Sequence, residues 1–206
     1  MEFTIAIPAY NSEKWLPGCL DSVWKQTHSD FRVVILDSGS TDGTIAWLNQ
    51  IKDPRLKVYE SDRRLSIEEN WGRIRDVAKT EFVTILGHDD LLYPDFLEII
   101  SKQVKEYPDA GIYHTHFDFI NETGRKIRAC QPMPSEIPFE DLLRRFLMGK
   151  IDLMATGYVV RSADYDLAGG IPTNYESLLF ADFELWLRLA RQGGMAVAAG
   201  WVVGSS

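Results

Sequence analysis

The feature that most constrains the fold of this chain is an alternation of short apolar runs with segments of helical period over about the first 120 residues. Phe3–Ile7 is a mostly apolar run of strand length, since helices of globular proteins are longer. Apolar residues between Trp15 and Trp24 then recur at helical spacing. Such an alternation is typical of βαβ units around a mainly parallel sheet, so we expect an α/β domain.

Turn and capping residues divide the rest of the chain into the same kinds of element. Ser66 and Glu69 have the spacing of a capping box, and Pro94 suits the first turn of a helix that Pro108 ends. The expected strands cover 3–7, 31–36, 56–59, 82–86, 111–120 and 153–160, with a hairpin that returns through 127. The expected helices cover 15–24, 45–48, 66–79, 94–107, 139–148 and 182–192.

At 206 residues, the chain has the length of one domain with some elaboration. Prolines concentrated in 131–138 mark a change in composition. We therefore predict a single domain, 1–206, with a larger first half, 1–130, and a smaller second half, 131–206. The sequence ends just after an apolar run, so we expect it to be part of a longer protein.

The charge balance and the cysteine content narrow the classes of function. Lys and Arg number 22 against 30 Asp and Glu, and this net charge of −8 disfavours nonspecific binding to nucleic acid phosphates. Cys19 and Cys130 show no metal-ligand spacing, which favours a reduced, cytoplasmic chain. The N-terminus lacks the pattern of a signal peptide, and no stretch approaches the roughly 20 apolar residues of a membrane span.

Polar clusters follow three of the expected strands. They are Pro8–Asn11, Asp37–Asp42 and Gly87–Asp90. Ligands of open α/β sheets bind beyond the carboxyl ends of the strands, so these clusters are the candidate binding residues. The first cluster contains no glycine, which argues against a P-loop or a dinucleotide-binding turn after the first strand.

Asp89 and Asp90 are adjacent carboxylates directly after a buried strand. Like charges this close disfavour joint ionisation unless a cation lies between them. Mg²⁺ and Mn²⁺ take hard oxygen ligands and often combine one or two carboxylates with substrate phosphates, so the pair predicts a divalent metal site that a diphosphate completes. The alternative is a pair of acids that only stabilises the N-terminus of the next helix.

Five motifs, in order and over nearly the whole chain, resemble those of the family 2 glycosyltransferases of the GT-A fold. They are Ile7–Asn11, Asp37–Thr44, Asn70–Ala78, Asp89–Asp90 and Ala181–Arg188. The resemblance implies a GT-A-like fold and a metal-assisted enzyme that transfers a sugar from a nucleotide diphosphate sugar to a hydroxyl acceptor with inversion. It also implies a glycan, lipid-linked or other hydroxyl acceptor, peripheral membrane association, and a role in cell-surface polysaccharide synthesis.

The resemblance assigns the donor-binding residues one by one, and the first half of the chain carries them. They are Pro8, Ala9, Tyr10, Asn11, Asp37, Ser38, Asn70, Arg73 and Asp89. Tyr10 would stack on the base, although a half-buried aromatic at a sheet edge is the alternative. Asp37-Ser38 departs from the family, which usually has two acids there, so the nucleotide stays open. Arg73 or Arg75 would reach the diphosphate, or one of them lies on a solvated helix face.

The predicted metal site also departs from the family pattern. Gly87 stands where the common D-x-D motif has its first acid, and the chain keeps Asp89 and Asp90. The resemblance implies that Asp89 approaches the ribose or the metal, and that Asp90 approaches the metal and the diphosphate. His88 either touches the sugar or faces solvent.

Asp182 matches the position of the family's catalytic base, at the start of the predicted helix 182–192. A carboxylate there can accept the proton of the attacking hydroxyl. Ala181 replaces the acid that usually precedes the base, so Asp182 lacks like-charge repulsion and should titrate at a lower pH. Glu184 is the alternative base, and an ordinary first-turn helix acid is the alternative reading of Asp182.

Other readings stay open from the sequence. His114, His116 and Asp118 alternate along a strand and so form a candidate for a second metal site, with an acceptor-side role for Asp118 as the alternative. Gly87 and Ala181, where acids are missing, raise the alternative of a nucleotide-sugar-binding domain without turnover. A nucleotidyltransferase is disfavoured because it would need a basic loop after the first strand.

Overall fold

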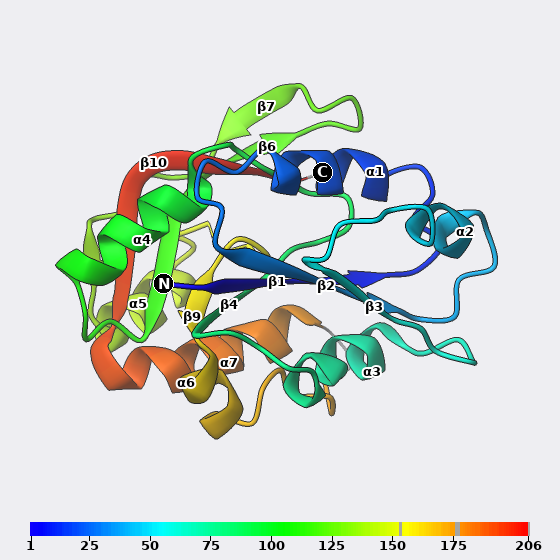
Figure 1. The fold of residues 1–206 in the computed structure, drawn as a ribbon. Helices are drawn as coiled ribbons and strands as arrows, with labels where there is room; N and C mark the ends of the chain where they lie inside the picture. Colours follow the sequence, from blue (N-terminus) through cyan, green and yellow to red (C-terminus); the bar gives the residue numbers. More distant parts are fainter. Residues whose placement is uncertain (153, 176–177, 206) are drawn as a thin grey trace.

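The computed structural model describes residues 1–152, 154–175 and 178–205, and its centre is one ten-stranded sheet. Along the main path the strand order is β3-β2-β1-β4-β9-β6-β10-β5, with β7 paired to β6 and β8 paired to β10. Figure 1 shows α1 on one side of this sheet and α3, α6 and α7 on the other. The predicted α/β class is confirmed.

The first half of the sheet comes from residues 3–85 and consists of four neighbouring parallel strands. Its strands are β1 (Phe3–Ala9), β2 (Phe31–Asp37), β3 (Leu56–Tyr59) and β4 (Phe82–Ile85). Ile5 of β1 lies in register between Val33 and Thr84 of its two parallel neighbours. Every residue of β1 and β4 is buried, because helices or loops cover both faces of the sheet, as is usual for parallel strands.

Helices connect these parallel strands, as crossovers between parallel strands require. They are α1 (Leu16–Trp24), α2 (Thr44–Leu48) and α3 (Ile67–Gly72), with α3 running into a 3₁₀ turn, Arg73–Asp76. α3 begins with the capping box that the sequence predicts, since the Ser66 hydroxyl accepts from the Glu69 backbone N–H and the Glu69 carboxylate accepts from the Ser66 N–H.

The second half of the sheet comes from residues 91–205, so it begins before the predicted boundary at 130. Its strands are β5 (Leu91–Leu92), β6 (Ile112–Ile120), β7 (Lys126–Ala129), β8 (Glu136–Ile137), β9 (Val159–Arg161) and β10 (Met195–Ser205). Its helices are α4 (Phe96–Glu106), α5 (Phe139–Leu147), α6 (Ser162–Leu167) and α7 (Leu178–Gly193). β9 pairs antiparallel with both β4 and β6, so it joins the two halves edge to edge.

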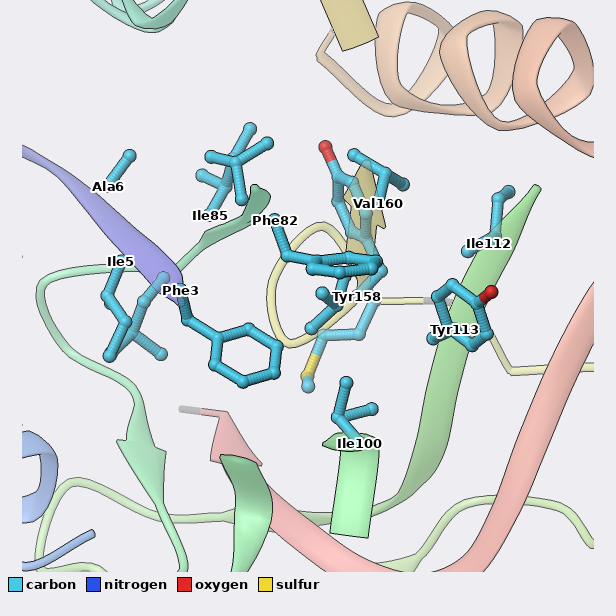
Figure 2. Close-up of a cluster of buried hydrophobic side chains, with 14 of the residues drawn as sticks. Phe3, Ile5, Ala6, Phe82, Ile85, Ile100, Ile112, Tyr113, Tyr158 and Val160 are labelled. Atoms are coloured by element: carbon cyan, nitrogen blue, oxygen red, sulfur yellow. The ribbon is translucent and has the colours of Figure 1, made fainter. Parts of the chain in front are cut away.

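Aromatic side chains from both halves pack together where β9 joins them (Figure 2). The Phe82 ring lies 5.7 Å from the Phe3 ring and 6.2 Å from the Tyr113 ring, between centroids. Tyr158, from the segment before β9, belongs to the same buried cluster. The two halves therefore share one core.

Several predicted boundaries are wrong. The helix predicted over 66–79 ends as α3 at Gly72 and continues only as the 3₁₀ turn, beyond which the Lys79 ammonium donates to the carbonyls of Ile74, Arg75 and Val77. The strand predicted over 153–160 is β9, 159–161, and Leu153 lies outside the described residues. α7 begins four residues before Asp182, so Asp182 is not a first-turn residue.

The sequence patterns missed β5, β8 and α6, which are too short to carry a periodic signal, and they also missed the longer strand β10. None of the helices in the described part of the chain combines the length and the apolar character needed to cross a bilayer.

Gly111, just before β6, should be intolerant of a side chain. A Cβ there would lie 2.0 Å from the carbonyl oxygen of Leu189 in α7, and a backbone atom of a packed helix cannot move away cheaply. We expect Gly111→Ala to destabilise the protein by about 2 kcal/mol or more and to lower Tm by several degrees.

Gly18 in α1 provides the matched control, because among the described residues no atom beyond its chain neighbours and its own helix backbone lies within 4 Å of its Cβ position. Gly18→Ala should leave Tm unchanged or raise it slightly, since alanine is the better helix former. Equal Tm values for the two variants in thermal unfolding would contradict the close approach of α7 to β6.

Candidate active site

The candidate site lies where the strand order reverses. β1 is followed along the chain by β2 on one side, and later by β4 on its other side, so a crevice opens beyond the carboxyl ends of β1 and β4. A pocket of about 790 Å³ occupies this place. Its walls come from the ends of β1 and β4, from the loop before α3, and from α3 itself.

The structure brings most of the predicted donor-binding residues to this pocket. Six of them line it: Pro8, Ala9, Tyr10, Ser38, Asn70 and Asp89. Five other predicted site residues do not line it: Asn11, Asp37, Arg73, Asp90 and Asp182. His88 also lines the pocket. This is one of the two placements of His88 that the sequence left open.

Tyr10 forms an aromatic wall of the pocket, and Arg64 lies against it. The Arg64 guanidinium carbon is 4.7 Å from the centroid of the Tyr10 ring, which is a cation–π contact. Trp71 and the 60% exposed side chain of Ile67 add apolar surface nearby. Sequence reasoning missed Arg64, because nothing in its local sequence signals that the loop folds back over Tyr10.

Ser38 is the residue that folds this loop back. Its backbone N–H donates to the Ala9 carbonyl at 2.9 Å, and its hydroxyl donates to the Leu65 carbonyl at 3.1 Å while accepting from the Leu65 N–H at 3.2 Å. Gly39 has a φ of +75°, and a Cβ there would lie 2.6 Å from backbone atoms of Arg63. The loop therefore packs directly on the end of β2.

Asp37 and Asn11 build the turns beside the pocket instead of lining it. The Asp37 carboxylate accepts from the backbone N–H groups of Gly39 and Ser40, at 2.9 and 3.0 Å. Asn11 has a φ of +46°, and its side-chain oxygen accepts from the Thr41 N–H at 2.8 Å. The Asp37 bonds stabilise the turn after β2, as short acceptor side chains commonly do, and the Asn11 bond joins the loop after β1 to the loop after β2.

Arg73 lies outside the pocket and ties α3 to the sheet. Its guanidinium donates to the carbonyls of Asp37 and Tyr59, at 2.7 and 2.9 Å, and to the side-chain oxygen of Asn70 at 2.9 Å. Burial lowers the pKa of Arg73. The predicted diphosphate contact does not fit this placement, and Arg75 pairs with Asp76 instead of lining the pocket.

The loop Gly87–Asp90 gathers two carboxylates at the end of β4. A Cβ on Gly87 would lie 2.6 Å from Oδ2 of Asp90 and 3.0 Å from Oδ1 of Asp89, so both carboxylates reach toward the same point. Asp89 lines the pocket, whereas Asp90 is 3% exposed and accepts from the Thr156 hydroxyl at 2.6 Å. Two converging carboxylates are hard oxygen donors, and they fit a divalent cation that a diphosphate would complete.

No further protein ligands gather into a metal site among the described residues, since no three His, Cys, Asp or Glu side chains form a suitable group there. His116 Nδ1 donates to the Ala198 carbonyl, and its Nε2 accepts from the Met133 N–H. Asp118 forms an ion pair with Lys126 at 2.7 Å and accepts from the Tyr93 hydroxyl. His114, His116 and Asp118 therefore do not form a second metal site.

Asp182 lies in the second turn of α7 and is 1% exposed. Its Oδ1 has no hydrogen-bond partner among the described residues. Burial raises the pKa of Asp182 to about 7, so the predicted lower titration is wrong. The physical reason is that removing a carboxylate from water outweighs the loss of one neighbouring acid at Ala181.

Aromatic residues with polar edges surround Asp182. Tyr158 and Trp186 make an edge-to-face contact with ring centroids 5.7 Å apart, and Trp186 stands one helical turn after Asp182. Burial and the Asp182 charge raise the pKa of Tyr158. Glu184, the alternative base, accepts instead from Tyr175 and forms an ion pair with Arg188.

The sequence and the fold match known glycosyltransferases. Residues 4–166 match the sequence profile of Glycosyl transferase family 2. "Glycosyltransferase GlyG" of Streptococcus pneumoniae is 26% identical over 59% of this chain and 41% of its own length. A "PGL/p-HBAD biosynthesis glycosyltransferase" of Mycobacterium bovis is 38% identical over 54% of this chain and 45% of its own length. The matched regions thus cover less than half of these relatives.

Solved structures show the same architecture. The crystal structure of residues 1–349 of Staphylococcus aureus TarS has a TM-score of 0.81 and 19% identity, and the match covers 100% of this chain and 60% of that one. TarS 1–349 has also been solved in complex with UDP, where the TM-score is 0.79 at 20% identity, and with UDP-GlcNAc. The predicted GT-A-like fold is confirmed.

The buried carboxylate of Asp182 should make stability depend on pH. Its pKa of about 7 in the folded protein exceeds its ordinary value of 3.8, so the folded state binds a proton that the unfolded state has released. This contribution is complete below the ordinary value and is lost as the pH rises through about 7. Asp182→Asn, which carries no charge, should therefore raise Tm relative to wild type by several degrees at about pH 8 and by less at about pH 5. Thermal unfolding at both pH values measures this, and a Tm difference that does not change with pH would contradict the raised pKa.

Proposed function

The chain belongs to Glycosyl transferase family 2, and on that premise we propose that it transfers a sugar from a nucleoside diphosphate sugar to a hydroxyl group of an acceptor, with inversion at the anomeric carbon. The observation that carries this proposal is the pocket at the strand-order reversal. It presents an aromatic wall at Tyr10, which suits the base, and the Asp89 carboxylate, which would suit the diphosphate once a divalent cation is bound.

The donor would lie with its base on the Tyr10 side of the pocket. The Arg64 guanidinium places a positive charge in the pocket wall, and it covers a face of Tyr10. A base stacking on that face would displace the guanidinium or insert beneath it, which leaves a positive charge beside the nucleotide. The TarS complexes with UDP and UDP-GlcNAc make a uridine nucleotide the first donor to test.

Asp89 and Asp90 would hold Mn²⁺ or Mg²⁺ together with the diphosphate. When bound, such an ion supplies positive charge to the leaving diphosphate. The two carboxylates themselves exclude an anion from this point, because like charges repel at such short range. Donor binding should therefore depend on the metal.

Asp182 would take the proton. The acceptor oxygen forms its new bond to the anomeric carbon, the bond from that carbon to the diphosphate oxygen breaks with its electron pair, and the hydroxyl proton passes to the Asp182 carboxylate. A pKa of about 7 matches a base that operates near neutral pH. Since Asp182 is 1% exposed, the acceptor must displace part of the protein that covers this carboxylate.

The acceptor in this proposal is a glycan, a lipid-linked compound or another hydroxyl compound, and a lipid-linked one would entail peripheral membrane association. A second candidate function is a domain that binds the nucleotide sugar without turnover. The observations that favour it are Gly87 and Ala181, which stand where the family usually carries acids.

Tyr10 should contribute to binding through its ring. Base stacking on an aromatic face is worth roughly 1 to 3 kcal/mol, so Tyr10→Ala should weaken UDP binding roughly tenfold or more, and should weaken binding of the sugar part less. Tyr10→Phe keeps the ring and should bind nearly as wild type. Calorimetric titration with UDP measures this. If the alanine variant bound UDP as tightly as wild type, Tyr10 would be structural only.

Turnover of the donor separates the two candidate functions. Asp182→Asn keeps the size of the side chain but cannot accept the proton, so turnover should fall roughly 100-fold or more while donor affinity changes little. Glu184→Gln is the matched control on the same helix and should keep most of the turnover. A loss of turnover in Glu184→Gln, with normal turnover in Asp182→Asn, would assign the base to Glu184 instead of Asp182. Donor binding by wild type without turnover of any donor would favour the binding domain.

A further inference from the structure

The Thr156 hydroxyl meets one of the two strand-end carboxylates from a segment far along the chain. Its Oγ1 donates to Oδ2 of Asp90 at 2.6 Å, across 66 positions in the sequence. Thr156 is 5% exposed and Asp90 is 3% exposed, so this bond is shielded from water. A hydrogen bond to a shielded, charged oxygen is short and strong, and it restricts rotation of the carboxylate.

The segment that carries Thr156 is fixed to the same strand that carries the carboxylates. The backbone N–H of Gly157 donates to the carbonyl of Ile85, the last residue of β4, at 3.1 Å. Gly157 has a φ of +77°, which glycine adopts without strain. β9 then continues beside β4, with Val159 opposite Thr84. The distance from Thr156 to the loop after β4 is therefore set by the sheet.

Helix α1 fixes the backbone of the same loop from the other direction. The buried thiol of Cys19 donates to the Gly87 carbonyl at 3.5 Å, and the Ser22 hydroxyl accepts from the Leu92 N–H at 3.1 Å. These bonds hold the backbone on either side of Asp90. The Thr156 hydroxyl differs from them because it contacts the carboxylate itself.

We propose that Thr156 is a positioning residue that orients the Asp90 carboxylate toward the divalent cation and the donor diphosphate. This inference rests on the proposed function, since it assumes that Asp89 and Asp90 hold the metal. Residues that hydrogen-bond to metal ligands set the orientation of those ligands, and their loss typically weakens metal binding 10- to 100-fold. Thr156 contributes its hydroxyl, and its methyl group fills buried space.

The test compares side chains that separate the hydroxyl from the volume. Thr156→Val replaces the hydroxyl with a methyl group, and Thr156→Ser keeps the hydroxyl. Thr84→Val is the matched control, because Thr84 is also buried, lies on β4, and has a hydroxyl without a hydrogen-bond partner among the described residues. The probe is UDP, titrated calorimetrically in Mn²⁺ and in excess chelator, with Mn²⁺ affinity measured separately by electron paramagnetic resonance and Tm measured for every variant.

We expect Thr156→Val to lose roughly tenfold or more in Mn²⁺ affinity in the presence of UDP, and in UDP affinity in Mn²⁺, while UDP affinity in chelator stays unchanged. Thr156→Ser and Thr84→Val should bind as wild type. If Thr156→Val does not fold, Thr156→Ala takes its place with the same expectation.

Wild-type affinities in Thr156→Val, or a serine variant as weak as the valine variant, would overturn the positioning role. Failure of the proposed function looks different, because wild type would then bind UDP no better in Mn²⁺ than in chelator. A loss of Tm without a change in Mn²⁺ affinity would assign Thr156 to packing alone and would also overturn the proposal.

Discussion

The parallel pairing of β1 with both β2 and β4 is the constraint on which the rest of the structure depends. Because the chain leaves β1 toward one neighbour and returns on the other side, the loops after β1 and β4 diverge and leave a pocket between them. All seven residues of β1 are buried, so the register that places Pro8 and Ala9 at the pocket is fixed by the core. The binding surface is thus a consequence of the way the sheet is wound.

Much of the polar chemistry near the pocket supports the backbone instead of facing a ligand. The Asp37 carboxylate closes the turn after β2, and the Asn11 side chain joins the loop after β1 to the loop after β2. The Arg73 guanidinium donates to carbonyls at the ends of β2 and β3. These bonds satisfy backbone groups that the strand ends leave unpaired. The Ser38 bonds to Leu65 hold the loop before α3 in position, and this position brings Arg64 over Tyr10.

Burial determines the pKa of the proposed base. Asp182 is placed inside α7 among Tyr158 and Trp186, so desolvation governs its pKa. The segment before β9 reaches Asp90 through Thr156 and approaches Asp182 through Tyr158, only two residues later. This short segment therefore links the carboxylate loop after β4 to the proposed base.

The sequence by itself determined the alternation of strands and helices in the first half, the capping box of α3, and the strand-end clusters, because these depend on local periodicity and turn chemistry. Only the tertiary structure decided which members of those clusters face the pocket. Asp37 and Ser38 are neighbours in sequence, yet one closes a turn and the other lines the pocket, because the Asp37 carboxylate accepts from the N–H groups of the turn after β2 and the Ser38 hydroxyl bonds to Leu65 of the pocket wall. The Arg64 contact, the Thr156 bond and the raised pKa of Asp182 depend on long-range packing, which no local pattern encodes.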